Sequence, residues 1–192
     1  FLIIERFTLK SASRINIVSG GFYEHINKFS KNKKISNYTN GIDENFLNNM
    51  ISITKKEIKS PIKILYAGNV GLGQGLENIL PETALKLKKD IEFTVIGSGN
   101  RARHLKKIID IENINNIKIN NPISQKELFK KYNDFDVLLL HLNDFQAYEK
   151  VIPSKLFEYA ATGKPILAGV KGYVKQFIKE KNNLTFVCLD EV

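Results

Sequence analysis

From Pro61 onward, short apolar segments alternate with segments that have helical spacing. Apolar runs between helices are typical of parallel strands that helices cover on both faces of a sheet. Right-handed crossovers between such strands give a doubly wound arrangement. The sequence therefore predicts an α/β fold with a Rossmann-like parallel sheet. The expected strands are 62–67, 92–96, 117–119, 137–140, 166–168 and 184–189, and the expected helices are 76–89 (kinked or restarted at Pro81), 102–111, 125–132, 155–161 and 174–179.

The first part of the chain has a shorter version of the same pattern. Residues 14–19 and 35–38 indicate two strands, with a helix expected at 22–29 between them. Asn40-Gly41 then predicts a turn, because both residue types tolerate positive φ. We therefore expect residues 1–43 to be the tail of a preceding Rossmann-like domain, 44–60 a linker with a short helix, and 61–192 a second domain. The chain begins with Phe and stops soon after a strand, so we expect both true termini to lie outside it.

Composition excludes several classes of protein. The formal net charge of +9 comes almost entirely from lysine, and no basic stripe interleaved with aromatic residues is present, so we expect no nucleic-acid partner. No apolar run approaches the roughly 20 residues of a membrane-spanning helix. Peripheral contact with an anionic membrane surface stays open. The single cysteine, Cys188, excludes an intrachain disulfide, fits a reducing compartment and is expected to be a buried strand residue.

The segment 151–168 carries the clearest chemical signal. Pro153-Ser154 predicts the start of a helix with Ser154 at the cap, which places Lys155 in the first turn and Glu158 just beyond it. The amino end of a helix favours an anion such as a diphosphate. A carboxylate accepts hydrogen bonds from paired sugar hydroxyls, so Glu158 could hold the sugar half of a nucleotide. The alternative is that Glu158 is a solvated residue that complements the helix dipole.

The run Ile-Pro-Ser-Lys-Leu-Phe-Glu that ends at Glu158 resembles the donor-binding motif of family-4 glycosyltransferases of the GT-B fold. It is most similar to enzymes of bacterial surface polysaccharides, such as lipopolysaccharide and capsule, that include N-acetylfucosaminyl transferases. The resemblance is strongest over 62–80 and 137–173. It implies that 1–43 ends an acceptor domain, that 61–192 is the C-terminally incomplete donor domain, and that Glu158 holds the ribose.

The same resemblance implies the reaction. A hexosyl group would pass, with retention at the anomeric carbon, from a nucleotide sugar to a glycan or lipid-linked acceptor. The donor would be a UDP-sugar rather than a GDP-sugar, and no cofactor or metal would be needed. The enzyme would lie in the cytoplasm, at the inner face of the plasma membrane.

Three loops follow expected strands and could cradle this donor. The first, 68–75, is rich in glycine, which lets the backbone approach phosphates closely. Family members usually have Arg and Lys where this chain has Asn69 and Gln74, although the surface-polysaccharide branch resembles this chain. We expect Lys155 and the first-turn amides to supply the missing charge. The substrate-binding residues expected overall are Gly68, Asn69, Gly71, Gly73, Gln74, Gly97, Gly99, Ile123, Ser154 and Leu156.

The other two loops carry weaker signals. Gly97 and Gly99 resemble a family Gly-x-Gly, but a tight turn into a helix explains them equally well. In the third loop, Ile123 lies where the nucleobase often contacts the main chain, and Ser124 with Glu127 has the spacing of a capping box.

A second carboxylate is a further catalytic candidate. The family pattern expects it at the position of Lys150, so Glu149, one residue out of register, is the candidate beside Glu158 and Lys155. His141 ends an expected strand at the same edge, where a hydrogen-bonded structural role is the more common one.

Two rival functions remain open. A non-catalytic nucleotide-sugar-binding fragment fits the neutral Asn69 and Gln74. A sugar-nucleotide epimerase of the GT-B fold would need further carboxylates and histidines, which are not evident. A nicotinamide-dependent oxidoreductase is disfavoured, because Gly97 stands where a ribose-binding acid would follow the second strand. No spacing indicates a metal site.

Overall fold

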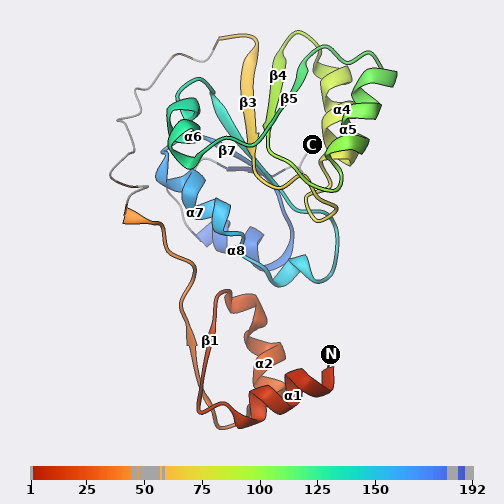
Figure 1. Cartoon of the computed structure of the whole chain (residues 1–192). Coiled ribbons are helices and arrows are strands. Elements are labelled where there is room, and N and C mark those ends of the chain that lie inside the picture. The colour runs from red at the N-terminus through yellow and green to blue at the C-terminus, as the bar shows by residue number, and fades with distance from the viewer. Residues whose placement is uncertain (1, 45–46, 48–56, 58, 181–185, 189–192) are drawn as a thin grey trace.

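The computed structural model describes residues 2–44, 47, 57, 59–180 and 186–188. A large unit built on one sheet lies above a small N-terminal unit in Figure 1. The predicted linker, 44–60, falls mostly outside the described residues, and so does the side chain of Cys188.

The large unit contains a six-stranded, all-parallel sheet in the order β5-β4-β3-β6-β7-β8. Counted from β3, this is the Rossmann order 3-2-1-4-5-6, whose direction of growth reverses between β3 and β6. The predicted doubly wound α/β fold is therefore confirmed. The strands are β3 (Ile62–Ala67), β4 (Ile91–Ile96), β5 (Ile117–Asn120), β6 (Val137–His141), β7 (Ile166–Gly169) and β8 (Phe186–Cys188).

Helices cover both faces of this sheet. One face carries α4 (Leu76–Leu87) and α5 (Ala102–Ile111), and the other carries α6 (Gln125–Tyr132), α7 (Ser154–Ala161) and α8 (Gly172–Glu180) (Figure 1). Successive residues of a strand point to opposite faces. Accordingly, Ile64 and Tyr66 of β3 pack with α4 and α5, whereas Leu65 and Ala67 pack with the other helices.

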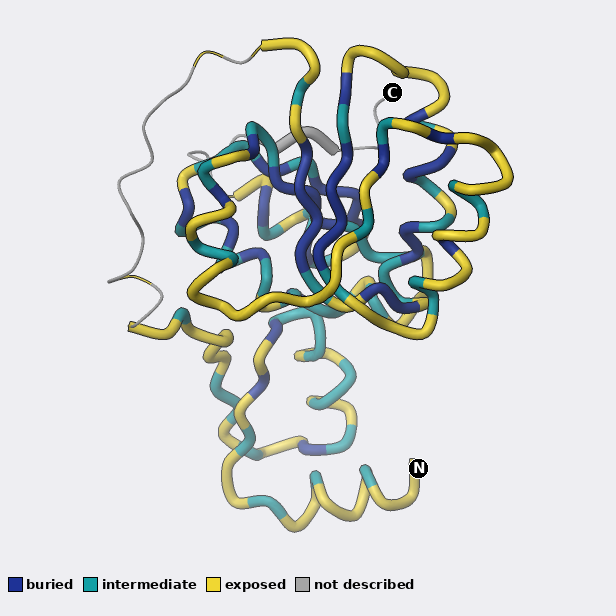
Figure 2. Tube along the Cα trace, turned by 45° about the horizontal axis from the view of Figure 1, so that its top comes forward, coloured by how far each residue is buried: buried dark blue, intermediate teal, exposed yellow. Residues whose placement is uncertain are grey.

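The buried core runs along the central strands, which are dark blue in Figure 2. Leu65, Val95 and Leu138 have no exposed surface. Burying each such side chain stabilises the fold by roughly 1.5–3 kcal/mol. Because this core surrounds the strands, their ends are held in fixed positions beside one another.

The small unit is a β-α-β fragment. Its parallel strands β1 (Arg14–Ile17) and β2 (Lys34–Asn37) flank the 3-10 helix η1 (Gly20–Phe22) and α2 (Tyr23–Phe29). A preceding helix, α1 (Leu2–Ser11), was not predicted. The two units touch where the Ser19 hydroxyl donates to the Lys150 carbonyl at 2.5 Å.

Two local predictions are wrong. Neither Asn40 nor Gly41 has a positive φ and no turn forms there, because the chain continues away from β2 without reversing. The restart expected at Pro81 does not occur: 76–87 is one helix, since Leu76, Leu80 and Ala84 bury one face of it against the sheet.

Candidate functional site

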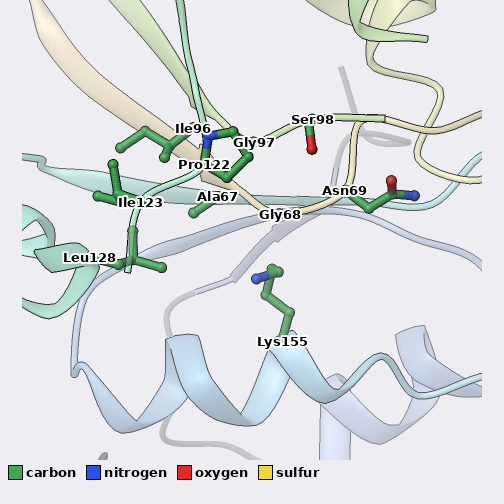
Figure 3. Close-up of a pocket in the computed structure, with 10 residues that line it drawn as sticks. All are labelled: Ala67, Gly68, Asn69, Ile96, Gly97, Ser98, Pro122, Ile123, Leu128 and Lys155. Carbon is green, nitrogen blue, oxygen red and sulfur yellow. The ribbon is translucent and has the colours of Figure 1, made fainter. Parts of the chain in front are cut away.

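The carboxyl ends of β3, β4 and β5 open into one hollow of about 340 Å³ (Figure 3). It lies beside the reversal of strand order between β3 and β6, where open α/β sheets bind ligands. The three predicted loops therefore meet, and α7 faces them. The residues that line the hollow are Ala67, Gly68, Asn69, Ile96, Gly97, Ser98, Pro122, Ile123, Leu128 and Lys155.

Of the described residues that line the hollow, Lys155 alone is charged. Its Nζ lies 3.8 Å from Glu158 Oε2 and 5.5 Å from the centre of the Tyr159 ring. A Cβ on Gly68 would lie 2.8 Å from Lys155 Cε, so the lysine stem lies directly against the first loop. Burial lowers the pKa of Lys155, and the neighbouring Glu158 opposes that shift. In such a partly desolvated place an ammonium attracts an anion more strongly than it would in water.

Tyr159 fixes α7 against the first loop. Its fully buried hydroxyl accepts a hydrogen bond from the Ala67 N–H at 3.0 Å and donates to the Ala67 carbonyl at 3.3 Å. Burial raises the pKa of Tyr159, so the hydroxyl keeps its proton. Because Ala67 ends β3 and directly precedes Gly68, this contact sets the place of Lys155 over the loop.

The rest of the predicted helix motif is divided between surface and core. Glu158, with a side chain 34% exposed, pairs with Lys155 but does not line the hollow. Leu156 is 1% exposed and packs in the core, so its side chain does not reach the hollow.

The predicted cap at Ser154 is wrong. Pro153 occupies the cap position and no side chain caps the helix, because α7 begins one residue earlier than expected. Ser154 is the first helical residue and is exposed.

The first loop is closed by the two residues that replace the expected cations. The Asn69 side-chain amide donates to Gln74 Oε1 at 3.0 Å, and the Gly71 N–H donates to the same oxygen at 3.2 Å. Gly68 and Asn69 line the hollow, whereas Gly71, Gly73 and Gln74 do not. A neutral hydrogen bond therefore stands at the two positions where the resemblance would place positive charges.

The second loop packs directly against the first. A Cβ on Gly97 would lie 1.8 Å from the Gly68 carbonyl oxygen, and one on Gly99 would lie 2.3 Å from the Val70 carbonyl oxygen. Gly97 lines the hollow and Gly99 does not. Close packing of two backbones explains both glycines.

The third loop forms an apolar wall. Pro122 and Ile123 contribute to it, and Leu128 of α6 continues it. The predicted capping box at the start of α6 is confirmed: Ser124 N–H donates to Glu127 Oε2 at 2.9 Å, and Glu127 N–H donates to Ser124 Oγ at 3.3 Å.

Glu149 lies apart from the hollow. It belongs to the 3-10 helix η2 (Tyr148–Lys150) and faces a separate small space beside Asp144 and Lys171. The structure therefore does not bring Glu149 to the same hollow as Lys155.

His141 holds the first loop from behind. Its Nδ1 lies 2.5 Å from the Gln74 carbonyl oxygen, which can only accept, so Nδ1 donates. Burial lowers the pKa of His141. This hydrogen bond supports the structural role that is more common for a histidine in such a position.

Several lining residues were not predicted, although a signal for most of them exists. Ala67, Ile96, Ser98 and Pro122 lie next to or within the predicted loops. Leu128 lies in the second turn of the helix that Ser124 caps, so only the way α6 packs could reveal it. Tyr159 directly follows Glu158, but nothing local predicts its contact with β3.

No group of three or more His, Cys, Asp or Glu side chains is placed to hold a metal ion within the described ranges. In those same ranges, no helix combines the length and the hydropathy that crossing a bilayer requires. Among the described residues at the hollow, an anion would meet the Lys155 ammonium and the Asn69 peptide N–H, which donates to no protein group, whereas the Gly68 and Gly97 N–H groups donate to the Ile96 and Asn120 carbonyls.

The profile of the family described as "Glycosyl transferases group 1" matches residues 50–188, which is well over half of the chain. The chain therefore belongs to the group 1 glycosyltransferases. No match was found among curated proteins.

Solved structures of GT-B glycosyltransferases share the fold. A glycosyltransferase from Rickettsia africae has a TM-score of 0.68 at 16% identity, over 95% of this chain and 52% of that one. Anabaena HepE, solved in complex with UDP and glucose, has a TM-score of 0.72 at 11% identity, over 97% and 52%. The pneumococcal O-GlcNAc transferase GtfA, in complex with UDP and GlcNAc, has a TM-score of 0.67 at 17% identity, over 98% and 37%. The chain thus spans about half, or less, of these relatives.

Proposed function

We propose that this chain binds the donor in a glycosyltransferase that moves a hexosyl group from a nucleoside-diphosphate sugar to a glycan or lipid-linked acceptor. The observation that carries the proposal is the position of Lys155 over Gly68, in a hollow at the switch point of the sheet. Membership of the group 1 glycosyltransferases supports the same reaction class.

The parts of the hollow suit the parts of such a donor. The apolar wall of Pro122, Ile123 and Leu128 suits a flat base, and Lys155 with the glycine loop suits a diphosphate. As the glycosidic bond breaks, negative charge grows on the departing diphosphate, and a cation already in place stabilises it. Glu158, one turn along α7, would accept hydrogen bonds from the ribose hydroxyls.

The donor base and the setting of the reaction complete the proposal. UDP is favoured over GDP, and two relatives that share the fold were solved with UDP. Retention at the anomeric carbon, a metal-independent reaction, a surface-polysaccharide acceptor and a cytoplasmic place at the membrane's inner face follow from the resemblance of the Ile152–Glu158 run. The extension to N-acetylfucosaminyl-transferase-like enzymes of family 4 has the same basis.

A non-catalytic donor-binding role is the second candidate. It is favoured by the neutral pair Asn69 and Gln74 in place of two cations, since less positive charge would face the leaving group. In this case the hollow would bind the nucleotide sugar without accelerating its transfer.

Titration calorimetry with UDP, GDP and their sugars tests both candidates, followed by assays of donor hydrolysis and transfer. The assays should use this chain and the longest form of the protein available. Binding with turnover supports the glycosyltransferase, and binding without turnover in either form supports the second candidate. If no nucleoside diphosphate binds, both are wrong.

A further inference from the structure

The first loop has an unusual distribution of hydrogen bonds. Every peptide carbonyl from Asn69 to Gln74 accepts one. In chain order, the donors are the Tyr66 hydroxyl at 2.6 Å, the Arg101 N–H at 3.0 Å, the Gln74 N–H at 3.0 Å, the Asn143 side-chain amide at 3.0 Å, the Asn143 N–H at 2.8 Å and His141 Nδ1 at 2.5 Å.

The donors of this loop are less occupied than its acceptors. In the part of the chain that the structure describes, the peptide N–H groups of Asn69, Leu72 and Gly73 make no hydrogen bond. A loop with occupied carbonyls and spare N–H groups presents the positive ends of its peptide dipoles, which makes it a binding place for anions. It does so without the arginine and lysine that the family usually has.

Asn143, just after β6, controls one of the spare donors. A trans peptide group points its C=O and its N–H to opposite sides, so binding the Leu72 carbonyl fixes the direction of the Gly73 N–H. The orientation of the Asn143 amide is itself determined, because its Oδ1 accepts from the Asp144 N–H at 3.0 Å.

His141 acts on the next turn of the loop. It binds the Gln74 carbonyl, whose peptide partner, the Gly75 N–H, donates back to the Gly71 carbonyl at 3.3 Å. Gly75 has φ +55, and a Cβ there would lie 2.9 Å from Asn143 Cγ. The end of β6 and the glycine loop are therefore fitted to each other.

We propose that the donor diphosphate extends from the hollow, which Asn69 lines, along the glycine loop to the Leu72 and Gly73 N–H groups outside that lining, and that Asn143 and His141 are positioning residues for it. By binding the Leu72 and Gln74 carbonyls they hold the loop with its spare N–H groups free for phosphate oxygens. This inference rests on the proposed function. Neither side chain touches the donor in this account, and each acts through the loop.

The test measures binding of a nucleoside diphosphate and of the matching monophosphate by calorimetry, with UDP and UMP, and GDP and GMP, as probes. We expect Asn143→Leu and His141→Leu to weaken diphosphate binding by about ten- to a hundredfold, since each leaves a loop carbonyl without its donor. Monophosphate binding should change by less than about threefold, because the base and ribose do not depend on these carbonyls. The ratio of the two affinities is therefore the critical quantity.

A conservative variant separates positioning from packing. In His141→Asn the amide nitrogen can replace Nδ1, so we expect diphosphate affinity within about threefold of wild type. If His141 acted only through packing, His141→Leu would keep more diphosphate affinity than His141→Asn, which is the reverse of what we expect. If Asn143→Leu does not fold, Asn143→Ala fits the same space.

Asn116 supplies the matched control. Its side-chain amide also donates to backbone carbonyls, those of Ala84, Lys88 and Ile91, at 3.0, 3.0 and 3.2 Å, but away from the hollow. Asn116→Leu should lower stability and leave both affinities unchanged. Equal losses of diphosphate and monophosphate binding, or no loss in either leucine variant, would overturn this inference alone. A wild-type chain that binds none of the four nucleotides would overturn the proposed function with it.

Discussion

The two glycine-rich loops at this sheet edge look alike in sequence and differ in what they need glycine for. In the loop at 68–75, Gly68 and Gly75 have positive φ, and three side chains from outside the loop, those of Tyr66, His141 and Asn143, bind its carbonyls. In the loop that follows β4, Gly97 and Gly99 leave room for the backbone of the first loop. Glycine thus sets the backbone conformation of the first loop, whereas in the second loop it allows close packing against the first.

The difference teaches that glycine at a strand end does not by itself mark a phosphate site. What distinguishes the first loop is that every carbonyl from Asn69 to Gln74 accepts a hydrogen bond and that a lysine lies across the loop. The second loop supports it as a backing layer: the Ser98 carbonyl accepts from the Val70 N–H at 2.8 Å. Substitutions in the second loop should therefore lower the stability of the fold, and substitutions around the first should change ligand binding.

The largest effect is expected for Gly97→Ala. The new methyl group would meet the Gly68 carbonyl oxygen, a backbone atom that cannot move without displacing β3. Overpacking of this kind costs about 3 kcal/mol or more of unfolding free energy. Urea denaturation measures it, with Gly41→Ala as control, since Gly41 has open space around it and ordinary φ. A wild-type midpoint for Gly97→Ala would remove the distinction between the loops.

Lys155→Met should come next. The variant keeps the apolar stem over Gly68 and removes the ammonium. We expect turnover of the nucleotide sugar to fall about a hundredfold, since it loses a charge that stabilises the departing diphosphate, while stability changes little. The measurement is steady-state donor turnover in whichever form of the protein is active. Lys107→Met, at an exposed position of α5, should leave turnover unchanged. Near-normal turnover in Lys155→Met would remove Lys155 from the mechanism.

A variant that adds two cations to the first loop tests whether charge or loop shape governs diphosphate binding. The double variant Asn69→Arg, Gln74→Lys adds two positive charges to the first loop and removes the Asn69–Gln74 hydrogen bond. We expect diphosphate affinity to rise about fivefold at low salt, with a steeper loss as salt increases, because the added attraction is screened. Calorimetry at two ionic strengths measures it. A fall in affinity at low salt would mean that the shape of the loop outweighs its charge.

The smallest effect concerns pH and His141. Burial lowers the pKa of His141, so below its ordinary value, near 6.5, the unfolded chain binds more protons than the folded one. Stability from this group is complete above about pH 7 and falls as pH drops through that ordinary value toward the lower folded one. As pH falls from 7.5 to 5.5, we expect the Tm of wild type to fall relative to that of His141→Asn by about 2 °C or less. The exposed His104→Asn is the control. A rise of the wild-type Tm relative to that of His141→Asn would contradict the buried, neutral state.

Most of the fold could be predicted because its signals are local. Apolar runs such as Ile62–Ala67 and Val137–His141 report burial on both faces, and the observed strands differ from the predicted ones mainly at their ends. The prediction of a turn at Asn40-Gly41 was wrong because turn propensity is local and does not report the direction that the chain takes after β2. Continuity through Pro81 was decided by burial of the helix face.

The site was predicted less completely. That the three loops would meet followed from parallel topology, and Gly68, Asn69, Gly97, Ile123 and Lys155 do line one hollow. The inward side chain of Leu156 and the separate place of Glu149 could not be predicted, because both depend on how helices rotate and pack on the sheet.

The sequence by itself determined the alternation of strands and helices, the parallel sheet that it implies and the edge at which a ligand would bind, since these depend on short-range patterns of apolar and glycine residues. Only the tertiary structure decided which residues hold the glycine loop. Tyr159, His141 and Asn143 lie between 67 and 92 positions away from the backbone groups that they bind. Such contacts exist only once the sheet has brought the ends of β3 and β6 together.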